Sequence, residues 1–242
     1  MKNLINQALV EKMAKEVLFS YPDFSKSKFK NMCSGLEELE LKARVLLITS
    51  ALKHHLPQDF SHSLKILVEI MQRDKLRGFD LWPFSEYIGQ FGLDHFSESL
   101  EAMKVLTLRF TAEFAVRPFF LKDSSEVLKF FKENINHPNV HIRRWISEGS
   151  RPLLPWGERL PEFMKDPASS LALLEELKFD EELYVRKSVA NHLNDISKNH
   201  PLLVIATVKR WLEESPLEHK KKIEWIKHKA LRTLIKKGHK EL

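Results

Sequence analysis

The sequence predicts an all-α protein built from successive pairs of packed helices. Apolar residues recur at helical spacing along nearly the whole chain of 242 residues, and only 7 residues are Gly, which is frequent in β-rich folds. In the second half, an apolar residue followed by basic ones returns after 43 and then 41 residues, as Ile142-Arg143-Arg144, Val185-Arg186-Lys187 and Ile226-Lys227-His228. Two-helix units with a period in the forties are typical of HEAT-type repeats, which stack into a right-handed α-solenoid.

The N-terminal 78 residues predict three helices. They are expected at residues 4–18, 36–52 and 61–73, with breaks at Tyr21-Pro22-Asp23 and near Leu56-Pro57. Proline marks both breaks because it lacks an amide hydrogen and disfavours the helical conformation in the residue before it.

The middle of the chain is less regular. The aromatic segment 78–84 is expected to be irregular and to precede a short helix at residues 85–90. Another helix is expected to begin near Phe96 and to include residues 107–114. It must end or kink by Arg117-Pro118, again because Pro118 has no amide hydrogen.

The repeated half predicts three helix pairs. Their first helices are expected at residues 124–134, 168–177 and 201–213, and each apolar-basic motif opens the second helix of a pair. In the segment 185–198, one face is apolar, and the opposite face is expected to hold Lys187, Asn191, Asn194, Asp195 and Lys198. Such faces line the concave surface of a solenoid, so this surface is expected to be polar and basic. We expect one domain, with N-terminal helices 1–78, repeats 79–219 and a basic C-terminal helix 220–242.

Charge is concentrated at the end of the chain. Residues 220–242 hold nine Lys or Arg against Glu224 and Glu241, a charge of +7, whereas the whole chain carries +6. A basic helix favours a polyanionic partner, and the alternative is a solvated helical face. The single Cys33 excludes an internal disulfide framework and suits a reducing cytoplasm. No apolar run is long enough for a membrane span, and we expect a cytoplasmic protein that does not associate with membranes.

The segment 141–157 carries the densest set of functional side chains. It joins three arginines and Glu148 to two tryptophans across a helix end and a proline-limited loop. Arginines hold phosphates, a carboxylate stabilises a cation, and an indole packs on a sugar or base. The structural alternatives are an ion pair of Glu148 with Arg144, and Trp156 capping the repeat core. No spacing of His, Cys or carboxylates indicates a metal site, and no cofactor is implied.

Three segments resemble the AlkC branch of the AlkC/AlkD-type DNA alkylation repair glycosylases, which are built from HEAT-like repeats. They are residues 111–119, 141–156, and 185–198 with Pro201 and 209–211. The resemblance implies excision of cationic N-alkylated bases, chiefly 3-methyladenine and also 3-methylcytosine, from double-stranded DNA without base flipping. It supports Glu113, Glu148 and Asp195 as the carboxylates near the deoxyribose, and Trp156 as an indole against the sugar of the lesion. The alternative for Glu113 is a pair with Arg109 or Arg117.

An alkylated base is already cationic and leaves readily, so the enzyme needs anionic charge near an oxocarbenium-like sugar and grips on the phosphates. We assign Glu148 as the main stabiliser, with Glu113 as its neighbour. The expected DNA contacts are Arg144, Arg151, Arg186, Arg143, Lys187, Asn191, Asn194, Lys227 and Lys229, of which Arg143 is the weakest because adjacent helical positions diverge by about 100°. We expect a monomer. Two other readings remain, a non-catalytic HEAT-repeat DNA-binding protein and a scaffold for an acidic protein.

Overall fold

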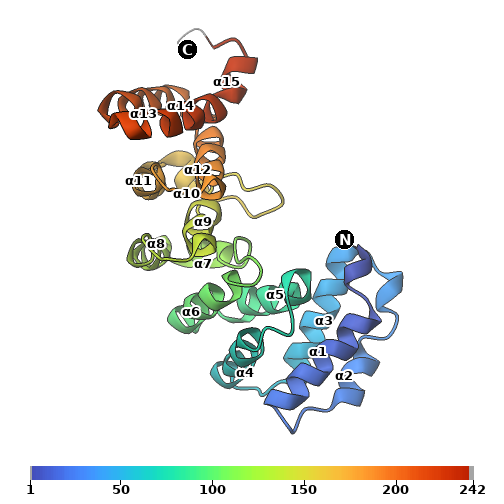
Figure 1. The fold of residues 1–242 in the computed structure, drawn as a ribbon. Coiled ribbons are helices and arrows are strands. Elements are labelled where there is room, and N and C mark those ends of the chain that lie inside the picture. Colours follow the sequence, from blue (N-terminus) through green and yellow to red (C-terminus); the bar gives the residue numbers. More distant parts are fainter. Residues whose placement is uncertain (1, 240–242) are drawn as a thin grey trace. The chain divides into compact units, whose positions relative to one another are not determined.

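The structure is a computed structural model that describes residues 2–239, and the regular elements among them are all helical (Figure 1). The expected all-α class is therefore confirmed. Residues 1–119 and 120–242 form two compact units, each with its own packed interior. Within the described residues, no helix is both long and apolar enough to cross a bilayer. The expected single domain and the concave basic surface stay predictions.

The first unit packs its helices against one another in a small set of contacts. Its elements are η1 (Lys2–Leu4), α1 (Gln7–Ser20), α2 (Lys26–Met32), η2 (Leu36–Glu38), α3 (Leu41–His55), α4 (Phe60–Gln72), η3 (Gly78–Leu81), α5 (Trp82–Phe91) and α6 (Phe96–Thr107). Helix α1 contacts α2 and α4, α3 contacts α5, and α4 contacts α6. Buried Leu, Ile, Val and Phe side chains fill the spaces between these pairs.

A buried arginine closes the N-terminal corner of this unit. The Arg44 side chain donates to the carbonyl oxygens of Leu39 and Ile5 at 2.8 and 2.9 Å, and to that of Glu37. These carbonyls lie at the turns around η1 and η2, where helix hydrogen bonds are missing. Arg44 thus supplies the donors that the turns lack.

The second unit has two layers of helices. Its elements are α8 (Ser124–Glu133), α9 (Val140–Gly149), α10 (Pro161–Lys165), α11 (Ala168–Leu177), α12 (Leu183–Ile196), α13 (Pro201–Glu214), α14 (Leu217–Ala230) and α15 (Arg232–Lys236), after the short α7 (Arg117–Lys122) at the unit boundary. Helix α12 packs between α9 and α14 and also contacts α11 and α13 (Figure 1). It is therefore covered on more than one face.

The paired helices of the repeated half are confirmed. The predicted helices 124–134, 168–177 and 201–213 correspond to α8, α11 and α13, and each is followed by the second helix of its pair. The third motif does not open its helix, because Ile226 lies deep within α14, which already begins at Leu217. Helices α2 and α10 were not predicted; each is a short element next to a proline or lysine-rich segment.

Two of the expected boundaries are wrong. Residues 36–52 are not one helix, because Leu39 and Glu40 have extended backbones that separate η2 from α3. Residues 107–114 are not helical after Thr107, because the Thr111 hydroxyl accepts the amide of Glu113 at 3.4 Å and competes with the helix. The helix that begins at Phe96 ends before Arg117-Pro118, as expected, and Pro118 is the second residue of α7, where the missing amide hydrogen costs nothing.

Candidate functional site

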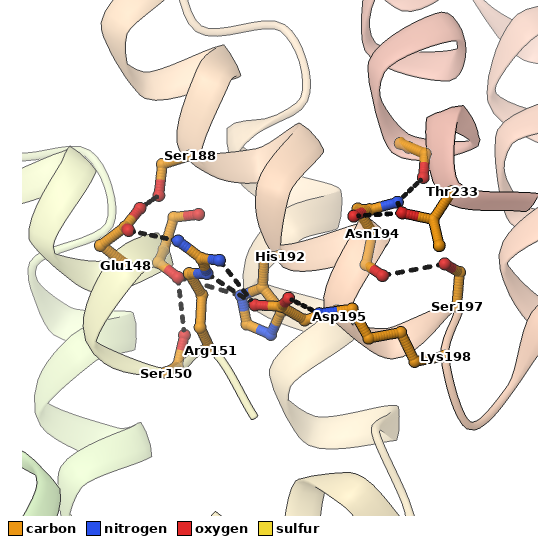
Figure 2. Close-up of polar contacts among 12 residues, drawn as sticks. Glu148, Ser150, Arg151, Ser188, His192, Asn194, Asp195, Ser197, Lys198 and Thr233 are labelled. Carbon is orange, nitrogen blue, oxygen red and sulfur yellow. Dashed lines mark hydrogen bonds and ion pairs between the residues drawn. The ribbon is translucent and has the colours of Figure 1, made fainter. Parts of the chain in front are cut away.

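A stripe of polar side chains on α12 faces α9. Ser188, His192 and Asp195 stand at i, i+4 and i+7, a spacing that places them on one face of the helix, and all three are buried. Each contacts the last turns of α9 or the residues that follow it (Figure 2). Neither Ser188 nor His192 was predicted, although this regular polar spacing in the sequence indicates a shared face.

Glu148 lies in the last turn of α9 and is 6% exposed. One carboxylate oxygen, Oε1, accepts from Nη1 of Arg151 at 2.5 Å and lies 3.5 Å from Nη2 of Arg144. The other oxygen, Oε2, accepts from the Ser188 hydroxyl at 2.5 Å. The predicted ion pair with Arg144 is therefore present, but it is the longest of three contacts in a buried cluster rather than an isolated surface pair.

Asp195 holds the other side of the same arginine. Its Oδ2 lies 2.8 Å from both Nε and Nη2 of Arg151, and its Oδ1 lies 2.9 Å from Nζ of Lys198. Burial lowers the pKa of Arg151, but the charges of Glu148 and Asp195 outweigh it and raise that pKa above its ordinary value. The guanidinium thus stays charged between two buried carboxylates. We call Glu148, Arg151, Asp195 and Ser188 the carboxylate cluster.

His192 fixes the contact between the two helices. Its Nδ1 lies 2.9 Å from the carbonyl oxygen of Ser147, and the ring is fully buried. A carbonyl oxygen only accepts, so Nδ1 carries the hydrogen in this contact. The bond anchors α12 beside the turn of α9 that carries Glu148.

Trp156 lies on the loop between α9 and α10, and its side chain is 98% exposed. The interpretation as a cap of the repeat core is wrong, because the indole covers nothing within its unit. Its backbone has a φ of +61°, a left-handed conformation that non-glycine residues adopt at a cost. The loop therefore holds a large apolar ring in water on a strained backbone.

Glu113 belongs to the first unit. Its side chain is half-buried, and its Oε2 accepts from the Thr111 hydroxyl at 2.8 Å. The nearby Arg109 contacts Asp74 at 2.9 Å. The role of Glu113 as a neighbour of Glu148 stays a prediction.

Arg151 and Arg143 do not lie as predicted for phosphate ligands. Arg151 is buried in the carboxylate cluster. Arg143 binds Asp180 through Nε at 2.6 Å, and this hydrogen bond raises its pKa above the ordinary value. Arg186, which was also expected to bind phosphate, donates from Nη1 to the carbonyls of Asp180 and Glu181 at 2.5 and 2.8 Å. These three guanidiniums hold the fold together.

Arg144 differs from them. Like Arg143 and Arg186 it is half-buried, but its guanidinium carbon lies 5.4 Å above the ring of Tyr184, and its contact to Glu148 is long, at 3.5 Å. Tyr184 itself is exposed at the start of α12. The role of Arg144 as a phosphate ligand stays a prediction.

The predicted polar face of α12 is only partly correct. Lys187 and Lys198 are exposed and Asn191 is half-buried, but Asn194 and Asp195 are buried. The Asn194 amide donates to the Ala230 carbonyl at 2.8 Å and to the Thr233 hydroxyl at 3.0 Å (Figure 2). Asn194 therefore joins α12 to the α14–α15 corner and is not placed to contact DNA.

The basic C-terminal segment is partly structural. Its apolar residues Ile223, Ile226 and Ala230 are fully buried, and α14 packs on α12. Lys229 is exposed and lies 6.0 Å above the Trp225 ring, whereas Lys227 is half-buried. Residues 240–242 of this segment lie outside the described residues. In the part of the chain that is described, His, Cys, Asp and Glu side chains form no group of three that could hold a metal ion.

Two known proteins are similar to this chain over its whole length. YhaZ of Bacillus subtilis (strain 168), an uncharacterized protein, is 41% identical over 243 residues, which cover 100% of this chain and 66% of that protein. The Pseudomonas fluorescens alkylpurine DNA glycosylase AlkC, solved bound to DNA containing an abasic site analog, is 38% identical with a TM-score of 0.88, covering 98% of this chain and 65% of that one. No protein-family model matches the sequence.

The chain thus spans about two thirds of the length of both relatives. The agreement with AlkC in helical arrangement is consistent with the paired helices described above. The chain belongs to the AlkC/AlkD-type family of DNA glycosylases, with their HEAT-like helical-repeat fold.

Proposed function

We propose that this protein is a DNA glycosylase that hydrolyses the N-glycosidic bond of cationic N-alkylated bases in double-stranded DNA, with 3-methyladenine and 3-methylcytosine as substrates. The observation that carries the proposal is the carboxylate cluster, which brings Glu148 of α9 and Asp195 of α12 together around Arg151, just before the loop that exposes Trp156. The similar AlkC, named an alkylpurine DNA glycosylase, supports the substrate class.

The reaction needs little acid catalysis. The bond between C1′ and the base nitrogen breaks, and its electron pair neutralises the cationic base. The sugar is left with oxocarbenium character, water adds to C1′, and one proton is released. A fixed negative charge in a poorly solvated setting stabilises that cation more than it would in water.

Glu148 is the proposed stabiliser because it is anchored on both oxygens and shielded from solvent. Asp195 adds a second negative charge through the shared arginine. Trp156 is proposed to lie against the deoxyribose of the lesion, where the face of its ring favours positive charge. Glu113, from the first unit, is proposed as the further carboxylate, and the lesion stays unflipped.

DNA binding is proposed to rest on the exposed or partly exposed polar groups of the second unit. They are Arg144, Lys187, Asn191, Lys227 and Lys229. Such contacts bind backbone phosphates and do not read the base sequence. They fix the register of the duplex relative to the cluster.

The alternative is a non-catalytic DNA-binding protein. One observation favours it: each carboxylate oxygen of Glu148 and Asp195 already has a donor within the protein. In that case the cluster only joins α9 to α12, and the protein binds DNA without releasing a base.

The test is release of free base from methylated duplex DNA by the purified protein without added metal or cofactor. We expect 3-methyladenine or 3-methylcytosine and abasic sites, and we expect Glu148→Gln to slow release at least about 100-fold while DNA affinity stays within about twofold. Glu162→Gln, which changes an exposed carboxylate on α10, is the control. Binding without release would favour the alternative.

A further inference from the structure

We propose that Ser188 is a positioning residue for the reaction, acting through Glu148. This inference rests on the proposed glycosylase function and adds a residue that the repeated basic motif does not single out. Ser188 is buried on α12, and its hydroxyl donates to Oε2 of Glu148 at 2.5 Å. That distance is in the range of hydrogen bonds from a hydroxyl to an ionised carboxylate.

Ser188 contacts Oε2, the Glu148 oxygen that neither arginine contacts. Arg151 and Arg144 both contact Oε1 of Glu148, so they fix one end of the carboxylate and leave it able to rotate about its terminal bond. The hydroxyl of Ser188 fixes the second oxygen from a different helix. The plane of the carboxylate is therefore set by donors from α9 and α12 together.

Serine in a helix ordinarily bonds the carbonyl of its own preceding turn. Other buried serines of this unit do so, including Ser150, which donates to the Ile146 carbonyl at 2.6 Å. Ser188 instead spans 40 residues of sequence to reach a charged side chain. Its hydroxyl is the donor that orients the carboxylate, because the ionised acid offers only acceptors.

A carboxylate that is 6% exposed has little water to replace a lost donor. In Ser188→Ala, Oε2 would lose its donor within the protein, and the carboxylate would turn away from its aligned position. Hydrogen-bond partners that orient metal ligands affect activity by about 10- to 100-fold, and we expect a loss of similar size here. DNA affinity is expected to stay unchanged, because Ser188 is buried.

The experiment compares single-turnover base release and DNA affinity for Ser188→Ala, Ser188→Thr and a control, Ser170→Ala. Ser170 is also fully buried, on α11, but its hydroxyl bonds only the Pro167 carbonyl at 3.0 Å. We expect release to fall about 10- to 100-fold in Ser188→Ala, with affinity within about twofold, and to recover in Ser188→Thr, which keeps the hydroxyl. Ser170→Ala should release base at the wild-type rate.

Thermal unfolding of all four proteins separates chemistry from folding. A wild-type rate in Ser188→Ala overturns the positioning role and leaves the glycosylase function standing. So does a folded Ser188→Thr that is as slow as Ser188→Ala, because the rate would then follow side-chain volume and not the donor. Absence of release from the wild-type protein itself overturns the glycosylase function and the positioning role with it.

Discussion

Arg151 and Asp195 are joined through a single oxygen: both Nε and Nη2 of the guanidinium lie 2.8 Å from Oδ2 of the carboxylate. The remaining edge of the guanidinium, through Nη1, reaches Glu148. One buried cation therefore holds two carboxylates that come from helices of successive pairs. This explains why Arg151 stays inside the protein and why it is not available to phosphates.

Removing that cation should destabilise the protein strongly. Arg151→Met leaves two buried carboxylates without their shared partner, which costs about 3 to 5 kcal/mol of the free energy of unfolding. Urea unfolding measures it. The control is Arg77→Met, which removes an exposed arginine from its pair with Asp74 and should cost less than about 1 kcal/mol. Equal costs would show that the cluster does not depend on Arg151.

Asn194 should contribute to stability and not to DNA binding. Asn194→Ala breaks the hydrogen bonds of the amide to Ala230 and Thr233 in the α14–α15 corner and should cost about 1 to 3 kcal/mol, measured by urea unfolding. Asn191→Ala, one turn earlier and half-buried, should change stability by less than about 0.5 kcal/mol. A loss of DNA affinity in folded Asn194→Ala would contradict its structural assignment.

Trp156 should contribute to base release and not to stability. Because its indole is 98% exposed and its φ is +61°, Trp156→Gly should be as stable as the wild type or more stable by up to about 1 kcal/mol. Base release should nevertheless fall, and Trp156→Phe should retain part of it. Thermal unfolding and release assays on the same preparations check both points. Marked destabilisation would mean that the loop packs elsewhere.

The exposed lysines of the C-terminal helices should set the salt dependence of DNA binding. Because α14 packs on α12, charge removal is a cleaner test than deletion. The test is a triple variant, Lys221→Gln, Lys229→Gln and Lys236→Gln. Its slope of log association constant against log salt concentration should become less steep by about 0.9 for each lost phosphate contact. The matched control changes three exposed lysines of the first unit, Lys28, Lys65 and Lys75, to Gln. Identical slopes would exclude this helix from the interface.

Cys33 should be unreactive in the native protein. Burial raises the pKa of its thiol to about 12, so the thiolate that reacts with a disulfide reagent is nearly absent at pH 8. Labelling should become fast only after denaturation. The raised pKa also means that its contribution to stability is complete below the unfolded value of about 8.5 and is lost as pH rises toward 12. Compared with Cys33→Val, wild-type stability should fall more steeply above pH 9.

The helix pairs of the second unit could be predicted because their period is carried by apolar residues. The apolar period allows α12 only one buried face, so Asn194 and Asp195 were wrongly expected on an exposed polar face. In the structure α12 lies between α9 and α14, so two of its faces are buried, and polar residues on the second face pair with polar groups. A pattern of apolar positions does not reveal such a face.

The sequence singles out candidate site residues, but it does not predict the contacts that these residues make with one another. Arginines on a basic helix were expected to face outward, whereas Arg143, Arg151 and Arg186 bind carboxylates and carbonyls that lie far away in sequence or at turns. These partners follow from tertiary packing, which local spacing does not specify. Ser188 was missed for the same reason, since its partner lies 40 residues away.

The exposure of Trp156 has an energetic meaning. A tryptophan side chain usually removes 150 to 250 Å² from water, which is worth about 4 to 6 kcal/mol at 25 cal/mol per Å². At 98% exposure almost none of this free energy is realised when the chain folds. A surface that covers the indole on binding would gain this free energy as affinity. The strain of the left-handed backbone does not reduce that affinity, because it is already present in the unbound protein.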